Sequence, residues 1–203
     1  MNKYITEFIG TFFLVLAAGF ASGEHAVLII ASALMVMIYA GGHISGAHYN
    51  PAVTLAVMIR GRIGISEGLI YMASQIIGAV AAALLVGFFK ETPAEPMVLH
   101  DTTRALLAEG LGSFALAYVV LNVATAKGTA GNSFYGLAIG FTVYFAGSLL
   151  GSLSGGAFNP AVAVGASVIQ AFAWSNLWIY IVACFGGAAL AALVFKMNNR
   201  DDK

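Results

Sequence analysis

Long apolar stretches separated by short polar segments are the main pattern of this 203-residue chain. A helix that crosses a lipid bilayer needs about 20 mostly apolar residues. Six stretches reach that length, and we expect membrane-spanning helices at about 5–22, 26–43, 67–89, 103–124, 132–151 and 174–195. An even number of crossings places both termini on one side of the membrane. The pattern therefore predicts an all-α membrane protein with six transmembrane helices.

The composition excludes several classes of protein. Hydrophobic residues make up 60% of the chain and charged residues only 9%, whereas soluble domains carry about 25% charged residues. Nine basic residues are balanced by nine acidic ones, so we expect no nucleic-acid partner. The single cysteine, Cys184, provides neither an intrachain disulfide nor a metal cluster. No catalytic triad, phosphate-binding loop or cofactor motif occurs in the sequence, so we expect no enzyme activity, cofactor or metal.

Lysine and arginine residues are unequally divided between the two sides of the predicted bundle. The side that holds the termini carries Lys3, Arg60, Arg62, Lys127, Lys196, Arg200 and Lys203, and the other side carries Lys90 and Arg104. Because positive charge accumulates in cytoplasmic loops, we expect both termini in the cytoplasm of a multi-pass cell-membrane protein. The polar segment 90–102 is then an extracellular linker that joins halves 1–89 and 103–198 of one transmembrane domain spanning 1–203.

Two uncharged stretches are too long for the helices assigned to them. Residues 25–59 and 128–195 contain no Asp, Glu, Lys or Arg, and each leaves a glycine-rich segment outside the predicted helices. Both of these segments lead into the same tetrapeptide, Asn-Pro-Ala-Val, at 50–53 and 159–162. Backbone that is not helical at membrane depth must be buried in protein or line a water-filled cavity. Each segment is therefore interpreted as a re-entrant loop that starts a half-helix inside the membrane.

The Asn-Pro pairs mark the start of both half-helices. Asparagine is favoured at the N-cap, and proline at the first helical position has no N–H to leave unpaired. A single Asn-Pro pair commonly caps a helix in an ordinary loop, but the same tetrapeptide in corresponding places of two halves favours an internal repeat. Each half contains three spans, so the halves have opposite orientations and their half-helices meet N-terminus to N-terminus in mid-membrane.

Two facing helix N-termini would create a positive potential that repels cations. The amides of Asn50 and Asn159 would donate hydrogen bonds there and interrupt a proton-conducting chain of water. We therefore expect a passive channel for water and small neutral solutes. Its central filter would comprise Asn50, Pro51, Ala52, Asn159, Pro160 and Ala161. The alternative is a secondary transporter for a small solute, which also uses inverted repeats but needs ionisable or ion-coordinating groups near the midplane.

Two segments carry a resemblance to a known family. The segments HISGAHYNPAVT (43–54) and GGAFNPAV (155–162) resemble the two signature loops of the aquaporin or major intrinsic protein family. The resemblance extends over essentially the whole chain. It implies a six-helix bundle with two half-helices, one pore in each subunit and assembly as a homotetramer in the lipid bilayer.

One position departs from the family pattern. Most members carry an arginine directly after the second Asn-Pro-Ala, where it lines the outer constriction of the pore, and this chain has Val162 there. Alignment outward from the two tetrapeptides assigns the other constriction positions to Ile30, Gly147 and Gly156. One more aliphatic side chain and two glycines would leave the constriction wide and uncharged. We therefore expect water to pass, together with ammonia, hydrogen peroxide or small polyols.

A few polar residues lie within the apolar stretches. Glu7 and Glu109 stand near the starts of the first and fourth spans, and we expect them to accept backbone N–H groups of the half-helix loops. A proton relay is the alternative, but the sequence offers no partner at matching depth. Gln75 is expected to support the loop in the same way. His43 is a candidate for the cytoplasmic pore mouth, where it would pack, line the pore or act as a pH gate.

Overall fold

The fold is described from a computed structural model that covers residues 1–90 and 94–202. Six helices in it are long and apolar enough to cross a membrane. They are α1 (Asn2–Phe20), α2 (Ala26–Ser45), α4 (Ile65–Lys90), α5 (Thr102–Val120), α6 (Tyr135–Ser154) and α8 (Leu177–Asn198). Two shorter helices, α3 (Pro51–Arg60) and α7 (Pro160–Val168), each begin at an Asn-Pro pair. The predicted all-α membrane fold with two half-helices is confirmed.

The observed helix ends differ from the predicted ones by a few residues. α6 ends three residues later than expected, where Gly155 takes a left-handed conformation with φ 93°. The helix that begins with α5 continues through a π-helical turn, Leu121–Thr125, before the chain leaves the bundle. A short 3-10 turn, Lys127–Thr129, follows it, and another, Trp174–Asn176, precedes α8. Apolar length alone does not mark such irregular turns, so the sequence could not place them.

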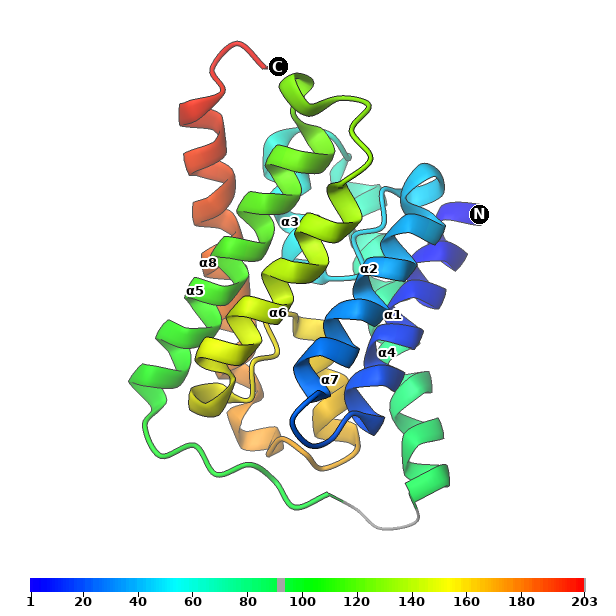
Figure 1. Cartoon of the computed structure of the whole chain (residues 1–203), viewed down its shortest axis with the longest axis vertical. Coiled ribbons are helices and arrows are strands. Elements are labelled where there is room, and N and C mark those ends of the chain that lie inside the picture. The colour runs from blue at the N-terminus through cyan, green and yellow to red at the C-terminus, as the bar shows by residue number, and fades with distance from the viewer. Residues whose placement is uncertain (91–93, 203) are drawn as a thin grey trace.

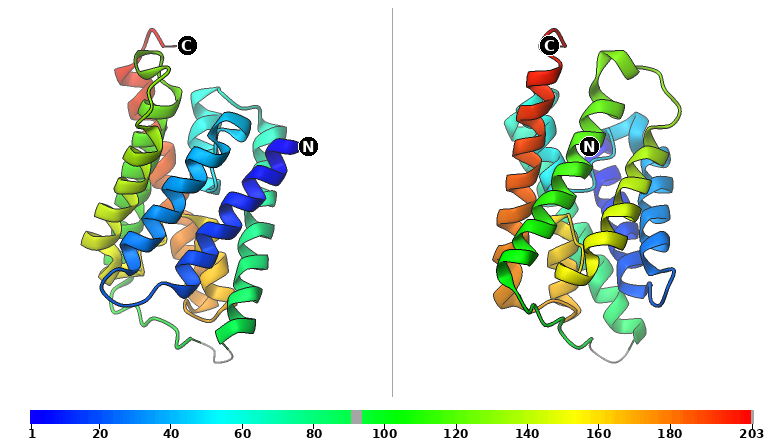
Figure 2. Two further views of the ribbon diagram at one scale, coloured as in Figure 1. Left: turned by 45° about the vertical axis from the view of Figure 1, so that its right-hand side comes forward. Right: turned by 60° about the vertical axis from the view of Figure 1, so that its left-hand side comes forward.

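The six long helices surround the two half-helices (Figure 1). Both termini lie at the same end of the bundle, and α3 lies in that half of the molecule. α7 lies in the opposite half, and the two further views in Figure 2 show the same separation. The N-terminal ends of α3 and α7 therefore face each other near the middle of the bundle, and the end of the bundle that holds the termini is called the inner end below.

Close helix pairs occur at equivalent places in the two halves. α1 packs on α4 in the first half, and α5 packs on α8 in the second. A Cβ atom on Gly78 would lie 2.5 Å from the carbonyl oxygen of Phe8, and one on Gly187 would lie 2.2 Å from that of Gly110. Glycine is therefore required at both crossings, as is common where helices approach closely in lipid.

Candidate pore and central filter

Each half-helix is capped by the asparagine of its Asn-Pro pair. Asn50 has extended backbone angles, and its Oδ1 accepts hydrogen bonds from the N–H groups of Ala52 at 2.8 Å and Val53 at 3.4 Å. Asn159 accepts from the N–H of Ala161 at 2.9 Å in the same way. Pro51 and Pro160 occupy the first helical positions. A backbone N–H there would have no partner within the helix, so its absence in proline costs no hydrogen bond.

The two caps are also bonded to each other's loops. The Nδ2 of Asn50 donates to the carbonyl oxygen of Phe158 at 2.9 Å. The Nδ2 of Asn159 donates to the carbonyl oxygen of Tyr49, also at 2.9 Å. An amide NH₂ has two hydrogens, so each asparagine keeps one donor beyond this reciprocal pair. The pair fixes both amides side by side at the junction of the half-helices.

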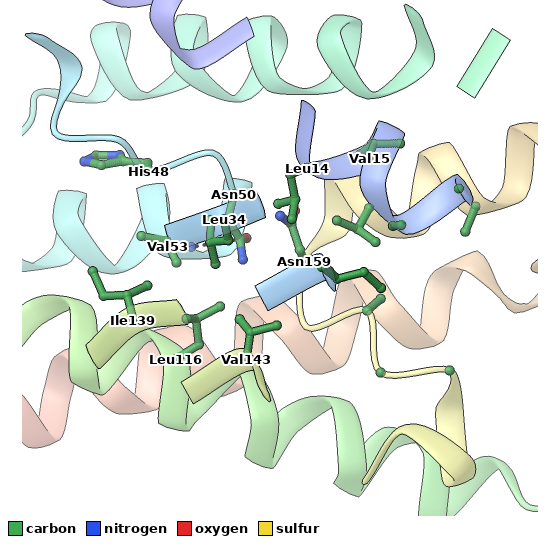
Figure 3. A pocket seen from close by; sticks show the side chains of 18 of the residues that line it. Leu14, Val15, Leu34, His48, Asn50, Val53, Leu116, Ile139, Val143 and Asn159 are labelled. Carbon is green, nitrogen blue, oxygen red and sulfur yellow. Dashed lines mark hydrogen bonds between the residues drawn. The ribbon is translucent and has the colours of Figure 1, made fainter. Parts of the chain in front are cut away.

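Both asparagines border a cavity with a volume of about 170 Å³ (Figure 3). Its wall is largely aliphatic and comes from α1, α2, α5, α6 and the two re-entrant segments. The lining includes Leu14, Val15, Leu34, Ile38, Val53, Leu116, Val120, Ile139, Val143, Ile169 and Phe172. Polar side chains are contributed by Asn50, Asn159 and His48. A small solute would therefore find a few hydrogen-bond partners in an otherwise apolar cavity.

Three of the four residues assigned to the outer constriction line this cavity. They are Ile30, Gly156 and Val162. Gly147 differs, because a Cβ on it would lie 2.6 Å from a methyl group of Val27 and so faces helix α2. Val143, one helical turn earlier, lines the cavity, as does Ile139 of the same helix. No charged side chain is present among the described residues of this lining.

His43 lies in the last turn of α2, whereas His48 lies in the re-entrant loop before α3. His43 is exposed and borders neither the main cavity nor the one next to it. His48 instead lines both the main cavity and a second cavity at the inner end of the bundle. Its position two residues before Asn50 was the sequence signal, since the re-entrant loop itself was expected to line the pore.

The second cavity, called the inner vestibule, has a polar rim. It is lined by Ser45, His48, Tyr71 and Thr125 together with charged residues at its edge. These charges are paired: Lys3 bonds Glu67, and Arg62 lies 3.4 Å from Asp202. Asp202 also lies 2.7 Å from the buried guanidinium of Arg60 and accepts from the N–H of Lys127 at 2.8 Å. The C-terminal segment is thus bound to both halves of the bundle.

Glu7 is fully buried and accepts four hydrogen bonds. Its Oε1 accepts from the Ser45 hydroxyl at 2.6 Å and the His48 N–H at 3.0 Å. Its Oε2 accepts from the Tyr49 N–H at 2.7 Å and from Nε2 of Gln75 at 2.8 Å. His48 and Tyr49 belong to the loop that precedes α3, and Ser45 is the last residue of α2. Glu7 therefore satisfies two backbone N–H groups of the loop that water cannot reach.

Glu109 has the same position in the second half and is also fully buried. Its Oε1 accepts from the Ser154 hydroxyl at 2.6 Å and the Ala157 N–H at 2.9 Å. Its Oε2 accepts from the Phe158 N–H at 2.6 Å and lies 3.6 Å from the thiol of Cys184. The thiol is fully buried and does not line the main cavity.

Tyr49 and Phe158 adopt left-handed backbone conformations, with φ of 49° and 48°. These conformations are costly for residues with side chains. In each loop this conformation lets the same residue make two hydrogen bonds. Its N–H donates to the buried glutamate of its own half, and its carbonyl oxygen accepts from the asparagine of the other half. Their aromatic rings occupy space that glycine leaves free, because a Cβ on Gly10 or Gly112 would lie about 2 Å from them. Backbone strain here is therefore compensated by hydrogen bonding and packing.

The described residues contain no group of three metal-ligating side chains. The residues gathered at the junction are amides, carbonyls and a single imidazole, and they are suited to hydrogen bonding with neutral molecules.

Comparisons with known proteins identify relatives of this chain. Residues 1–195 match the family described as major intrinsic protein. The chain is 36% identical to the "Glycerol uptake facilitator protein-like 6" of Lactiplantibacillus plantarum, with 100% of both sequences covered. It is 32% identical to the "Putative aquaporin NIP4-1" of Arabidopsis thaliana, covering 100% of this chain and 76% of that protein. Its fold matches the X-ray structure of the aquaglyceroporin from Plasmodium falciparum with a TM-score of 0.81, at 21% identity and covering 96% and 94% of the two chains.

Proposed function

The chain belongs to the major intrinsic protein family and is a passive membrane channel for water and small solutes; from this premise we propose that its pore admits specific neutral solutes besides water. The candidates are ammonia, hydrogen peroxide and small polyols. The observation that carries the proposal is the cavity wall around Val162, where Ile30 and Val143 add only aliphatic side chains. A relative that aligns over the full length of both sequences is named as a glycerol uptake facilitator, which supports the passage of small polyols.

The central filter would exclude ions while passing such solutes. The N-terminal ends of α3 and α7 each carry a partial positive charge, which opposes the entry of cations. The second amide hydrogens of Asn50 and Asn159 can donate to the oxygen or nitrogen of a neutral solute. Water that accepts from both asparagines cannot form a continuous proton-conducting chain through the filter.

A secondary transporter would need groups that couple solute movement to an ion. Among the described residues that line the main cavity, His48 is the single titratable side chain. Glu7 and Glu109 accept hydrogen bonds from the loops that precede the half-helices, so their oxygens are already engaged. These features favour a channel over coupled transport.

Several features of the assembly belong to the same proposal. We propose a homotetramer in the cell membrane, with a pore in each subunit and both termini in the cytoplasm. Halves 1–89 and 103–198 would then be inverted repeats of one domain, joined by an extracellular linker at 90–102. The common end of the two termini and the excess of lysine and arginine there support the orientation.

The solute range can be tested in proteoliposomes. Stopped-flow light scattering would compare water, ammonia, hydrogen peroxide and glycerol fluxes for the parent, Val162→Arg and the matched aliphatic control Val162→Leu. We expect the arginine variant to lower the glycerol-to-water permeability ratio about tenfold or more, which corresponds to about 1.4 kcal/mol of added barrier. The leucine variant should stay near the parent. A parent that passes water alone, or a flux that requires an ion gradient, would contradict the proposal.

A further inference from the structure

A single benzene ring borders the main cavity, and it comes from the segment that follows α7. Within the part of the chain that the structure describes, Phe172 is the only lining residue that carries such a ring. Figure 1 shows this segment at the end of the bundle opposite the termini, which is called the outer end. Phe172 and Val162 pack against the same buried cluster, which includes Tyr180. The ring therefore lies at the level of the residue assigned to the outer constriction.

Contacts on two sides confine the ring of Phe172. One face stacks on the ring of Tyr180, with the centroids 4.6 Å apart and the planes inclined by 5°. Tyr180 is itself buried, and its hydroxyl donates to the carbonyl oxygen of Ser154 at 2.6 Å. The edge of the Phe172 ring lies against Gly155, another lining residue, because a Cβ there would lie 2.5 Å from two ring atoms. The ring therefore cannot move toward Tyr180 or Gly155 to make room for a solute.

The linker between the two halves holds the segment that carries Phe172. The N–H of Met97 donates to the carbonyl oxygen of Ala171 at 2.9 Å, and the N–H of Phe172 donates to that of Ala166 in α7 at 3.1 Å. The Sδ of Met97 lies close to the ring edge, since it is 3.3 Å from the position of a Cβ on Gly155. Connecting segments are commonly mobile, but this one is tied both to α7 and to the linker.

We propose that Phe172 is a specificity-determining residue that sets the largest neutral solute the channel passes, and that the linker residue Met97 positions its ring. The proposal rests on the proposed function above and adds a size limit to it. The diameter of a pore decides which neutral solutes can enter, and a ring that cannot yield is a fixed barrier at the level of Val162. Glycerol passes beside the ring, whereas erythritol, a polyol longer by one carbon, is retarded.

Stopped-flow measurements in proteoliposomes would compare erythritol and glycerol fluxes for the parent and two variants of Phe172. Because one carbon more or less in an apolar site changes selectivity about tenfold or more, we expect Phe172→Ala to raise the erythritol-to-glycerol permeability ratio about tenfold. Phe172→Leu keeps part of the bulk and should raise the ratio about threefold. Trp174 provides the control, because it belongs to the same segment but is exposed and does not line the cavity. Trp174→Ala should leave the ratio unchanged.

A double-mutant cycle tests the positioning role of Met97. Met97→Ala removes the thioether beside the ring but keeps the backbone hydrogen bond to Ala171, so we expect the ratio to rise about two- to threefold. If Met97 acts through the ring, adding Met97→Ala to Phe172→Ala raises the ratio no further. Independent effects that multiply in the double variant would overturn the positioning role, since a contribution to stability alone would not depend on the ring.

The outcomes separate this proposal from the proposed function. An unchanged erythritol-to-glycerol ratio in a folded Phe172→Ala protein would overturn the size limit. If that variant fails to fold, Phe172→Leu and Met97→Ala decide by the same criterion. A parent that passes water alone would contradict the proposed function instead. In that case, glycerol passage gained by Phe172→Ala would support the size limit, and no gain would overturn it.

Discussion

Half-helices α3 and α7 are each held by a buried glutamate of their own half, and the two sites differ in what surrounds that glutamate. In both halves the carboxylate binds a serine hydroxyl and two consecutive backbone N–H groups. A buried tyrosine completes each site: the hydroxyl of Tyr71 donates to the carbonyl of Ser45 at 2.9 Å, and that of Tyr180 donates to the carbonyl of Ser154 at 2.6 Å. The backbone geometry of the loops is therefore kept in both halves.

The side chains next to the two carboxylates are not alike. Near Glu7, the amide of Gln75 links the carboxylate to Thr54, which in turn bonds His48. The corresponding positions near Glu109 hold Cys184, Ala163 and Ala157. The second site therefore keeps only the bonds that support the backbone, apart from a weak thiol contact. The first half therefore contains a side-chain network, from Glu7 through Gln75 and Thr54 to His48, that the second half lacks.

The largest expected effect comes from removing either carboxylate. Glu7→Gln and Glu109→Gln would each place an NH₂ group against backbone or hydroxyl donors and leave at least one of them unsatisfied. We expect the free energy of unfolding to fall by about 2–4 kcal/mol in each case. The loss should be greater for Glu7, whose Oε2 accepts from an amide nitrogen as well as a backbone N–H. Melting temperatures of the purified variants in detergent would measure it, and a parent-like Glu7→Gln protein would contradict the shared role.

The second prediction compares Gln75, which bonds Glu7, with Cys184, which lies beside Glu109. Gln75→Leu removes a donor from Glu7 and from Thr54 and should cost about 1–2 kcal/mol. Cys184→Ala removes only a weak thiol contact and a small apolar group, so we expect a loss below about 1 kcal/mol. The same melting experiment compares them directly. Equal losses would mean that the two sites are more alike than their hydrogen bonds indicate.

The smallest effect concerns the far ends of the half-helices, which also differ. α3 ends at Arg60, which forms an ion pair with Asp202. In the chain after α7, the carbonyl oxygen of Ala171 accepts a hydrogen bond from the N–H of Met97 at 2.9 Å. The N–H of Lys127, and then the nearby Arg60, hold the pKa of the Asp202 carboxyl below its usual value. A lowered pKa means that this carboxylate stabilises the fold above the unfolded-state pKa of about 3.9 and loses that effect as pH falls through the lower folded-state pKa.

Asp202→Asn should therefore lower the melting temperature slightly at pH 7. The difference from the parent should shrink as the pH is brought below 4. Arg104, an exposed residue whose partner Asp101 lies three positions before it, provides a control, and Arg104→Gln should leave the melting temperature unchanged. A pH-independent difference between Asp202→Asn and the parent would show that the ion pair is not its source.

The sequence predicted the positions of the helices better than it predicted which of their side chains line the cavity. Both half-helices followed from the repeated Asn-Pro pair, because an N-cap and a first-turn proline specify a helix start locally. Gly147 was assigned by alignment along a helix, and such a count does not determine how a helix is rotated about its axis. In the structure Val143 lines the cavity and Gly147 faces Val27 of α2 instead. The hydrogen bonds between the two halves depend on tertiary contacts and leave no local signal.

The reciprocal amide bonds between the two loops have a consequence for biosynthesis. The acceptor of the Asn50 amide, Phe158, lies 108 residues later in the chain, so it is made long after α3 has entered the membrane. Until then the amide of Asn50 and the carbonyl of Tyr49 have no partner in an apolar surrounding, which is unfavourable. The first half therefore cannot reach its mature form during its own synthesis. Completion of the central filter is therefore a late event that requires both halves of the chain.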